Sequence, residues 1–401
     1  MRIHPEAITK GIDPLILFCL CVLVVFLPIA HTESIRAFAL SIPVGLWLIK
    51  MIGQRHWVWL RTPVDLPILL FSIIGALSLV PAIDFRYSAR EFLEEWVMGI
   101  VLLYLVIQNV QPRQIIYIFG ALLLGNVIMV SYGIYDFFHH GGELFDYKIR
   151  AGSLHSGFGT FSTYLITIIP YLLIAVWVIQ RPLWRGILLI LLLGNFLSLY
   201  LTHARGAWLA AAVLLLLTAF TFFKRRILLL PLIFVLVVLG AWLPSSIFRH
   251  HTQINPQSAP ASRIETGQAR WELIKFSLEK IKENPFRMLG YGRRVFVKKF
   301  EEIFLRFKGA QLWHAHNTFL NIAFQTGLQG LVFFIFLVYK LFKYLYTQSR
   351  VEPIYWKKYT YVATYLMVTT FFVRNLSDDF FVDDSALLFW FLSGLAISMK
   401  K

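Results

Sequence analysis

Two histidines stand where a polar segment meets a long apolar run. Residues 313–317 are Trp-His-Ala-His-Asn, and residues 318–340 are predominantly apolar. Imidazole is the side chain that most readily transfers a proton near neutral pH, and a helix N-terminus favours developing negative charge. We predict that His316 acts on a substrate hydroxyl, with Asn317 and His314 as substrate-binding neighbours. The alternative is that either histidine is a helix cap or a packed residue.

Two arginines are candidates for binding an anion during catalysis. Arg205 lies in a very short turn, residues 202–208, between two apolar runs, and Arg270 opens an amphipathic segment. A guanidinium at a membrane boundary is costly unless it is paired or faces a wet cavity. We therefore predict that Arg205 and Arg270 are catalytic. The alternative for Arg205 is a side chain that extends to lipid headgroups.

Three further arginines are candidate substrate-binding residues. Arg293 and Arg294 follow a Gly-Tyr-Gly turn at 290–292, and Arg150 precedes an Ala-Gly-Ser segment at 151–153. Arginine forks bind phosphate through two hydrogen bonds, and a flexible glycine turn lets backbone amides approach an anion. For Arg293 and Arg294 the alternative is a solvated face attracted to anionic lipid.

Four aspartates crowd one turn after Arg374: Asp378, Asp379, Asp383 and Asp384. They could bind a divalent cation, but such a site needs several converging oxygens. The acids of a loop are also found solvated or paired with arginines. We therefore predict no metal.

The composition indicates what kind of element positions these residues. Of 401 residues, 58% are hydrophobic and 15% are charged, which is too little polar surface to cover a soluble globule. The formal charge of +16 sits in short clusters between apolar runs rather than along one polar face, so we expect no nucleic-acid partner. The chain is predicted to be an all-α polytopic integral membrane protein.

About 12 apolar runs are long enough to cross a bilayer, with boundaries uncertain by a few residues. They lie at 14–30, 35–52, 66–83, 92–109, 114–135, 158–179, 184–202, 206–223, 227–243, 317–342, 359–376 and 385–399.

The charges of the loops predict the orientation. Lys and Arg residues alternate from loop to loop with Asp and Glu, which places both ends of the chain in the cytoplasm. A long basic loop at 244–316 then falls on the outer side, between nine helices in residues 1–243 and three in residues 317–401. Within the loop, segments near 271–281 and 295–307 are amphipathic, so we predict two helices lying at the membrane surface in contact with lipid.

All the strongest candidates fall on the outer side of this topology. Arg205, Arg270, Arg293, Arg294 and His316 were selected for their chemistry, whereas the topology rests on other charges. Arginines and a base above a bilayer suit a lipid-linked diphosphate. An anion transporter is the alternative from another class. It predicts ionisable residues near the middle of several helices, whereas the strong ones here lie at the ends of the runs.

The order and spacing of these motifs resemble the O-antigen ligase family, whose members share about a dozen helices and a long periplasmic loop. His316-Asn317 followed, after nine residues, by Gly-Leu-Gln-Gly at 327–330 is similar to the signature of that family. The turn around Arg205 and the segment from Arg270 to the glycine turn at 290–292 match in order. Leu331 departs from the hydroxyl-bearing or aromatic residue common there. We expect the glycines at 327–330 to allow close helix packing.

The resemblance implies transfer of a polysaccharide from undecaprenyl diphosphate to a lipid A-core acceptor. The reaction would take place at the periplasmic face of the inner membrane of a Gram-negative bacterium, with no cofactor and no metal. Arg205 and Arg270 would hold the donor diphosphate, His316 would act on the acceptor hydroxyl, and Arg293 would assist. An O-antigen polymerase and a protein O-oligosaccharyltransferase resemble this family and share the donor, so they are alternatives that differ in the acceptor.

Overall fold

Every regular element that the structure describes is a helix, which confirms the all-α prediction. The computed structural model describes residues 5–54, 61–145, 149–155, 157–222, 263–301 and 314–400. In chain order the helices are α1 (Pro5–Phe26), α2 (Glu33–Gln54), α3 (Asp65–Leu77), α4 (Phe85–Glu91), the π-helix η1 (Phe92–Val97), α5 (Met98–Asn109), the 3₁₀-helix η2 (Pro112–Gln114), α6 (Ile115–His139), α7 (Phe158–Val178), α8 (Pro182–Leu201), α9 (Arg205–Phe222), α12 (Arg263–Glu283), α13 (Arg294–Lys299), α15 (Thr318–Val351), α16 (Tyr355–Asn375) and α17 (Asp383–Ser398).

Six stretches are long and apolar enough to cross a membrane, so the protein is a multi-pass membrane protein. They are Glu33–Gly53, Pro112–His139, Phe158–Val178, Pro182–Leu201, Arg205–Phe222 and Thr318–Val351, and shorter apolar helices occur at Gly11–Phe26 and Asp65–Leu77. The predicted run at 66–83 is helical only as far as Leu77, because a turn precedes Pro81, which has no N–H to continue a helix. The run at 227–243 lies outside the described residues. The total of about 12 spans, the bounds of the outer loop and its side of the membrane stay predictions.

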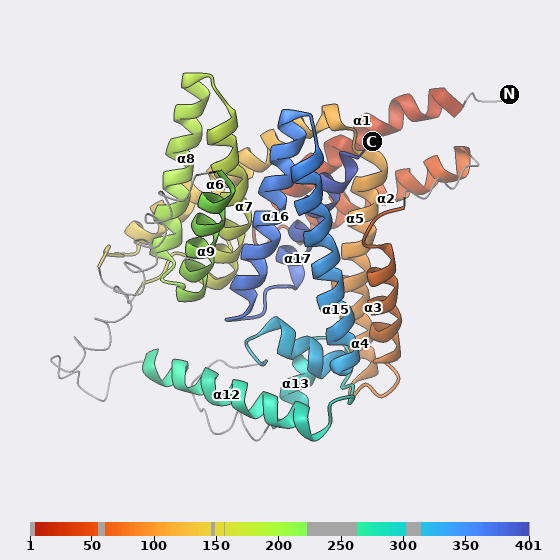
Figure 1. Ribbon diagram of the computed structural model, residues 1–401, viewed down its shortest axis with the longest axis vertical. Helices are drawn as coiled ribbons and strands as arrows, with labels where there is room; N and C mark the ends of the chain where they lie inside the picture. The colour runs from red at the N-terminus through yellow and green to blue at the C-terminus, as the bar shows by residue number, and fades with distance from the viewer. Residues whose placement is uncertain are drawn as a thin grey trace.

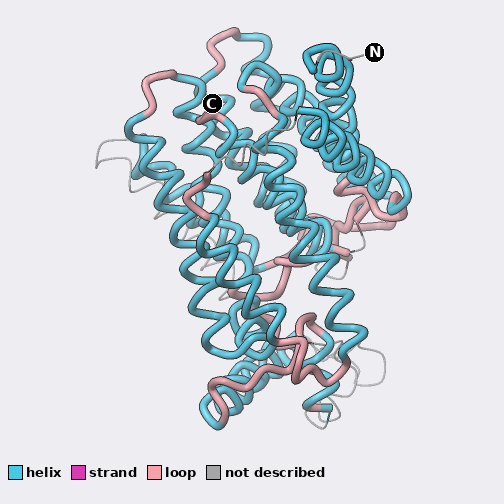
Figure 2. The backbone as a smooth tube through the Cα atoms, turned by 90° about the vertical axis from the view of Figure 1, so that its right-hand side faces the viewer, coloured by secondary structure: helices cyan, strands magenta, loops and turns pink. Residues whose placement is uncertain are grey.

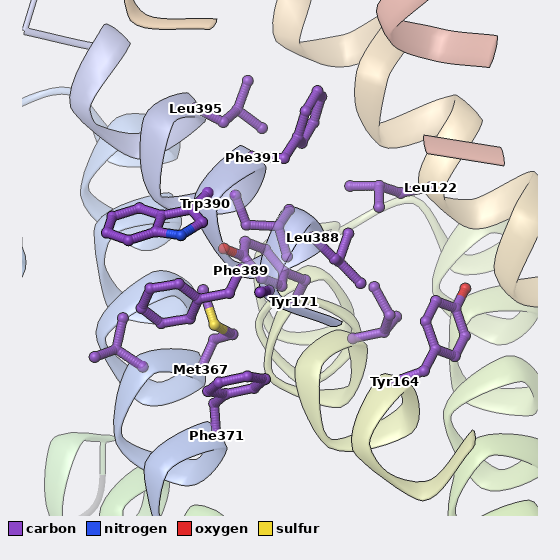
Figure 3. Close-up of a cluster of buried hydrophobic side chains, with 14 of the residues drawn as sticks. Leu122, Tyr164, Tyr171, Met367, Phe371, Leu388, Phe389, Trp390, Phe391 and Leu395 are labelled. Atoms are coloured by element: carbon purple, nitrogen blue, oxygen red, sulfur yellow. The ribbon is translucent and has the colours of Figure 1, made fainter. Parts of the chain in front are cut away.

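The long helices form a bundle, and the start of α1 and the end of α17 lie towards the same end of it (Figure 1). The tube view from the side shows the same elongated bundle of helices (Figure 2). Its core is rich in aromatic side chains from α16 and α17, such as Phe371, Phe389 and Trp390 (Figure 3). Phe371 and Phe389 contact each other at a tilted angle, and Phe389 and Trp390 contact each other edge-on, so that the rings fill this space.

The helix after His316 is interrupted at Gly327, where φ is 73° and ψ is 175°. Only glycine adopts this conformation readily. α15 therefore consists of a short arm, residues 318–326, and a long arm, residues 328–351. The prediction of one unbroken helix over 317–342 is wrong, and Gly327 is required by backbone conformation rather than by packing. Gly330 does fit the packing prediction, because a Cβ there would overlap Thr326 and approach Ile74 of α3.

Helices α12 and α13 lie across the end of the bundle opposite the chain ends, beside the short arm of α15 (Figure 1). A small hydrophobic cluster joins the three elements; we call it the loop core. It consists of Leu273, Leu289, Val295, Phe296, Ala315 and Phe324. The segment that follows α12 is also hydrogen-bonded to α15 around its interruption at Gly327. The Leu328 N–H donates to the Pro285 carbonyl at 2.9 Å, and the Leu289 N–H donates to the Phe324 carbonyl at 3.1 Å. α12 and the short arm are thus held as one unit.

α12 buries one face against the protein and leaves exposed two residues of the apolar face that was predicted to contact lipid. Leu273 and Ser277 are buried, whereas Trp271 and Leu278 of the predicted apolar face are 59% and 45% exposed. An exposed apolar edge on a helix that crosses the bundle end fits a membrane-surface helix, which stays a prediction. The second amphipathic helix is shorter than predicted, since α13 ends at Lys299, and residues 302–313 lie outside the described part of the chain.

Candidate active site

The turn between α16 and α17 is the centre of the candidate site; we call residues 376–384 the acidic turn. Asp379 is buried, and its two carboxylate oxygens accept hydrogen bonds from Thr318 Oγ1 and Asn321 Nδ2, each at 2.6 Å. Both donors belong to the short arm of α15. The acidic turn is therefore a packed element that holds the start of α15. Its other acids pair with arginines, as one of the alternatives had it: Asp378 with Arg270, Asp383 with Arg293 and Asp384 with Arg36.

His316 faces Asp378 of this turn. His316 Nδ1 lies 2.9 Å from Asp378 Oδ1, and His316 Nε2 is buried with no hydrogen-bond partner among the described residues. The backbone of His316 has φ of 47°, an uncommon left-handed conformation for a residue with a side chain. Such strain persists only where surrounding contacts impose it. The imidazole is thus held with one nitrogen on a carboxylate and the other unengaged.

The tautomers of the two histidines follow from these contacts. His314 Nδ1 accepts the His316 backbone N–H at 3.0 Å, so the proton of a neutral His314 sits on Nε2, which lies 3.8 Å from Asp378 Oδ1. Burial, with a contribution from the neighbouring His316, lowers the pKa of His314 to about 3. His314 is therefore neutral at physiological pH and supports the backbone of His316. This contact matches the packed-residue alternative, while its substrate contact stays a prediction.

Asp378 carries a stable negative charge. Burial alone would raise the pKa of this carboxyl, but the hydrogen bond from His316 and the charges of Arg270 and Arg374 outweigh it and hold the pKa well below its usual range. An ionised Asp378 accepts a proton-bearing Nδ1 from His316. The lone pair of His316 then lies on Nε2, which is the arrangement that a general base requires.

Arg270 and the Arg205 turn both lie against the acidic turn. Arg270 Nη2 is 3.6 Å from Asp378 Oδ2. Arg205 is exposed at the start of α9, and a Cβ on the adjacent Gly206 would overlap the Ser377 hydroxyl. The structure therefore brings His316, Arg270 and the Arg205 backbone to one turn, although these residues are far apart in the sequence.

Arg150 lies beside the same region. The Ala151 N–H donates to the Leu201 carbonyl at 3.0 Å, just before the Arg205 turn, and the Arg150 guanidinium stacks 4.3 Å from the centroid of the Phe158 ring. A contact of Arg150 with an anion stays a prediction.

Arg293, Arg294 and Asn317 have structural contacts. Arg293 Nη2 pairs with Asp383 Oδ2 at 3.0 Å. Burial alone would lower the pKa of Arg293, but the charges of Asp379 and Asp383 outweigh it and raise the pKa. Arg294 is exposed, and its backbone N–H donates to a tyrosine hydroxyl of α4. Asn317 caps α15, since its Oδ1 accepts the Leu320 N–H, and its Nδ2 donates to the Leu376 carbonyl at 2.9 Å. The substrate contacts proposed for these three residues stay predictions.

The two glycines of the turn before Arg293 are closely packed and have left-handed backbone conformations. Gly290 and Gly292 are buried with φ of 102° and 104°. A Cβ at Gly290 would lie 2.7 Å from the Ala82 Cβ, and one at Gly292 would lie 2.8 Å from a ring carbon of Tyr87. Both glycines are therefore required by conformation and by packing against the start of α4. That the backbone amides of this turn contact an anion stays a prediction.

The histidines and Asp378 also have the composition of a metal site, since their ligand atoms lie within 4.8 Å of one another. The surroundings disfavour a cation. Arg270 already contacts the same carboxylate, and a divalent ion would add positive charge beside a guanidinium. The expectation that the protein uses no metal stays a prediction.

Two features of the site were missed. The sequence predicts Asp378 as a partner of an arginine and not as the partner of His316, and it predicts no role for Arg374. An arginine in the last turn of an apolar run was a signal for Arg374. Nothing in the sequence pairs Asp378 with a histidine so far away in the chain, because the pairing arises from packing of the short arm.

The fold and the site define a helical membrane protein with a buried histidine–aspartate pair and a group of arginines at one end of the bundle. A model of the family described as O-antigen ligase matches residues 187–335 of this chain, and the match supports membership of the O-antigen ligase family. The matched region runs from α8 into α15, so it contains Arg205, Arg270 and His316. It supports a ligase or polymerase type of function in general. No curated protein matches the chain.

Proposed function

We propose that this protein is an O-antigen ligase, which transfers a polysaccharide from undecaprenyl diphosphate to a lipid A-core acceptor at the periplasmic face of the inner membrane. The observation that carries the proposal is the His316–Asp378 pair, with Nε2 of His316 unengaged and Arg270 beside it. The family match supports the same type of reaction.

The reaction is a single displacement. The acceptor hydroxyl loses its proton to His316 Nε2 as its oxygen attacks the anomeric carbon of the donor glycan. The bond from that carbon to the phosphate oxygen breaks, and undecaprenyl diphosphate leaves with the electron pair. The configuration at the anomeric carbon inverts. Asp378 stabilises the imidazolium that forms, because its carboxylate accepts the hydrogen bond from the Nδ1–H of His316 throughout the reaction.

The arginines stabilise the leaving group. Negative charge grows on the diphosphate as the glycosidic bond breaks, and a preorganised donor placed where charge develops is worth about 3 kcal/mol in other enzymes. Arg270 is suited to this role because it is 38% exposed and is held by Asp378 at one nitrogen. Arg205, which is exposed at the other side of the acidic turn, completes the diphosphate contact.

Transfer assays with purified protein test this proposal. Undecaprenyl diphosphate-linked glycan is supplied with a lipid A-core, with a second molecule of the donor glycan, or with a protein acceptor. A product on the lipid A-core supports the ligase, and a product on either other acceptor identifies the polymerase or the protein oligosaccharyltransferase. Absence of transfer, with anion flux into liposomes, would favour a transporter.

Variants tie the reaction to the site. His316→Ala is expected to lower the turnover by about 10²–10⁴-fold, the usual contribution of a positioned base. Arg270→Ala is expected to lower it by about 10²-fold or more. His140→Ala and Arg350→Gln are matched controls, because His140 pairs with Asp136 on α6 and Arg350 stacks on Tyr346 on α15, and neither belongs to the site. Full activity of both site variants would refute the assignment.

A further inference from the structure

Arg374, in the last turn of α16, has no assigned role in the reaction above. The residue is 4% exposed, and its Nη1 donates to Ser377 Oγ at 2.8 Å. Its guanidinium stacks on Phe380 at 4.4 Å from the ring centroid. Its Nε is buried without a hydrogen-bond partner, and Arg374 forms no ion pair with any described carboxylate.

A buried guanidinium without a carboxylate is costly. A charge removed from water requires an opposite charge or a full set of hydrogen bonds to offset the loss of hydration. The acids nearest in the chain are committed elsewhere, since Asp378 contacts His316 and Arg270, and Asp379 contacts the short arm of α15. The dipole of α16 favours a cation at this end, but it supplies only part of the compensation. Because Arg374 has no ion pair among the described residues and Asp378 acts on it only from a distance, its charge is compensated in part, which points to an anionic ligand.

The position of Arg374 indicates which anion this residue stabilises. A Cβ placed on Gly206 would lie 3.1 Å from Arg374 Nη1, so this guanidinium lies directly against the backbone that follows Arg205. On the other side its charge acts on Asp378, the carboxylate that contacts Arg270. Arg374 is thus placed between the two arginines that hold the donor diphosphate in the proposed function.

We propose that Arg374 is a third, buried arginine of the anion site and that it makes the site select a diphosphate over a monophosphate. This inference rests on the proposed function. The attraction between a fixed cation and an anion grows with the charge of the anion, and burial reduces its screening by salt. Arg374 therefore stabilises a diphosphate more than a monophosphate, acting through space beneath the Arg205 turn.

The test compares the binding of undecaprenyl diphosphate and undecaprenyl monophosphate to the full-length protein in nanodiscs. The wild type is expected to prefer the diphosphate. Arg374→Gln is expected to reduce that preference by about 10-fold or more, which corresponds to the loss of one charged interaction. Arg374→Lys keeps the charge and is expected to keep the preference. Arg350→Gln, which removes another ring-stacked arginine far from the site, is expected to change nothing.

The outcomes separate this inference from the proposed function. An equal loss of affinity for both lipids in Arg374→Gln, or an unchanged preference, would overturn the role of Arg374 and leave the proposed function standing. A wild type that binds neither lipid would overturn both. If Arg374→Gln does not insert into the membrane, Ser377→Ala replaces it, because it removes the partner of Arg374 Nη1. An unchanged preference in Ser377→Ala would then count against the inference.

Discussion

Replacement of Asp378 by Asn tests the central pair of the site most directly. The change keeps the volume of the side chain and removes its charge. In the native protein Asp378 Oδ1 lies 2.9 Å from His316 Nδ1, and a carboxylate can only accept the Nδ1 proton. An amide in place of this carboxylate can turn its NH₂ group to Nδ1. It then stabilises the opposite tautomer of His316, in which Nε2 carries the proton and cannot act as a base.

The expected loss can be worked from this contact. A buried hydrogen bond to a charged group contributes about 1.5–3 kcal/mol, and the wrong tautomer removes most of the roughly 10²–10⁴-fold contribution of a general base. Asp378→Asn is therefore expected to lower kcat by about 10²–10⁴-fold. The KM for the donor is expected to change less, because the arginines remain.

The assay is glycan transfer to the lipid A-core, measured over a range of donor concentrations. A variant that keeps the wild-type kcat would refute the assignment of Asp378 as the positioning residue of His316. Acid unfolding gives a second measurement. Because the folded protein holds the pKa of Asp378 below its unfolded value, the pair stabilises the protein above about pH 4 and loses that contribution as pH falls further. Asp378→Asn is expected to lack this acid-dependent loss.

Three further outcomes are expected. Gly327→Ala forces a side chain into φ of 73° and is expected to cost about 1–3 kcal/mol, seen as a lower unfolding temperature; an unchanged temperature would contradict the kink. Between about pH 6.5 and pH 3 the unfolded chain binds a proton at His314 that the buried imidazole, with its pKa of about 3, does not bind, so the native protein loses stability as the pH falls through this range. His314→Gln is expected to abolish this loss, which is checked by measuring the free energy of unfolding against pH. The side-chain amides of Asn126 on α6 and Asn195 on α8 donate hydrogen bonds to each other at 3.0 and 2.8 Å. Asn126→Leu alone is expected to lower the free energy of unfolding by about 1–3 kcal/mol, because it leaves Asn195 without its partner, and the double variant with Asn195→Leu is expected to lower it by less, which a double-mutant cycle measures.

The sequence predicted the helical class and most of the helices, because a bilayer demands long apolar runs. It failed at Gly327 and at Leu77, where a local backbone conformation or a following proline ends a helix that hydrophobicity alone would extend. A glycine inside an apolar run can serve packing or a left-handed φ, and the sequence does not distinguish these uses.

The site was predicted in part for a similar reason. His316, Arg205 and Arg270 could be selected because unpaired polar groups at helix ends are costly in a membrane. Their connection to the acidic turn could not be predicted, since it depends on how α15 and the turn pack. Asp378 and Arg374 gain their roles from that packing, which joins residues by contact rather than by spacing.

The position of the acidic turn in the chain has a consequence for biosynthesis. His316, Arg270 and Gly206 all precede the turn that they contact, and a ribosome makes the chain from the N-terminus. Until the acidic turn has been synthesised, Arg270 and His316 lack the carboxylate of Asp378 that they contact in the folded protein. On the proposed function, a nascent chain that stops before residue 376 is therefore expected to be inert towards a lipid-linked glycan, and activity is expected only once the hairpin of α16 and α17 has docked.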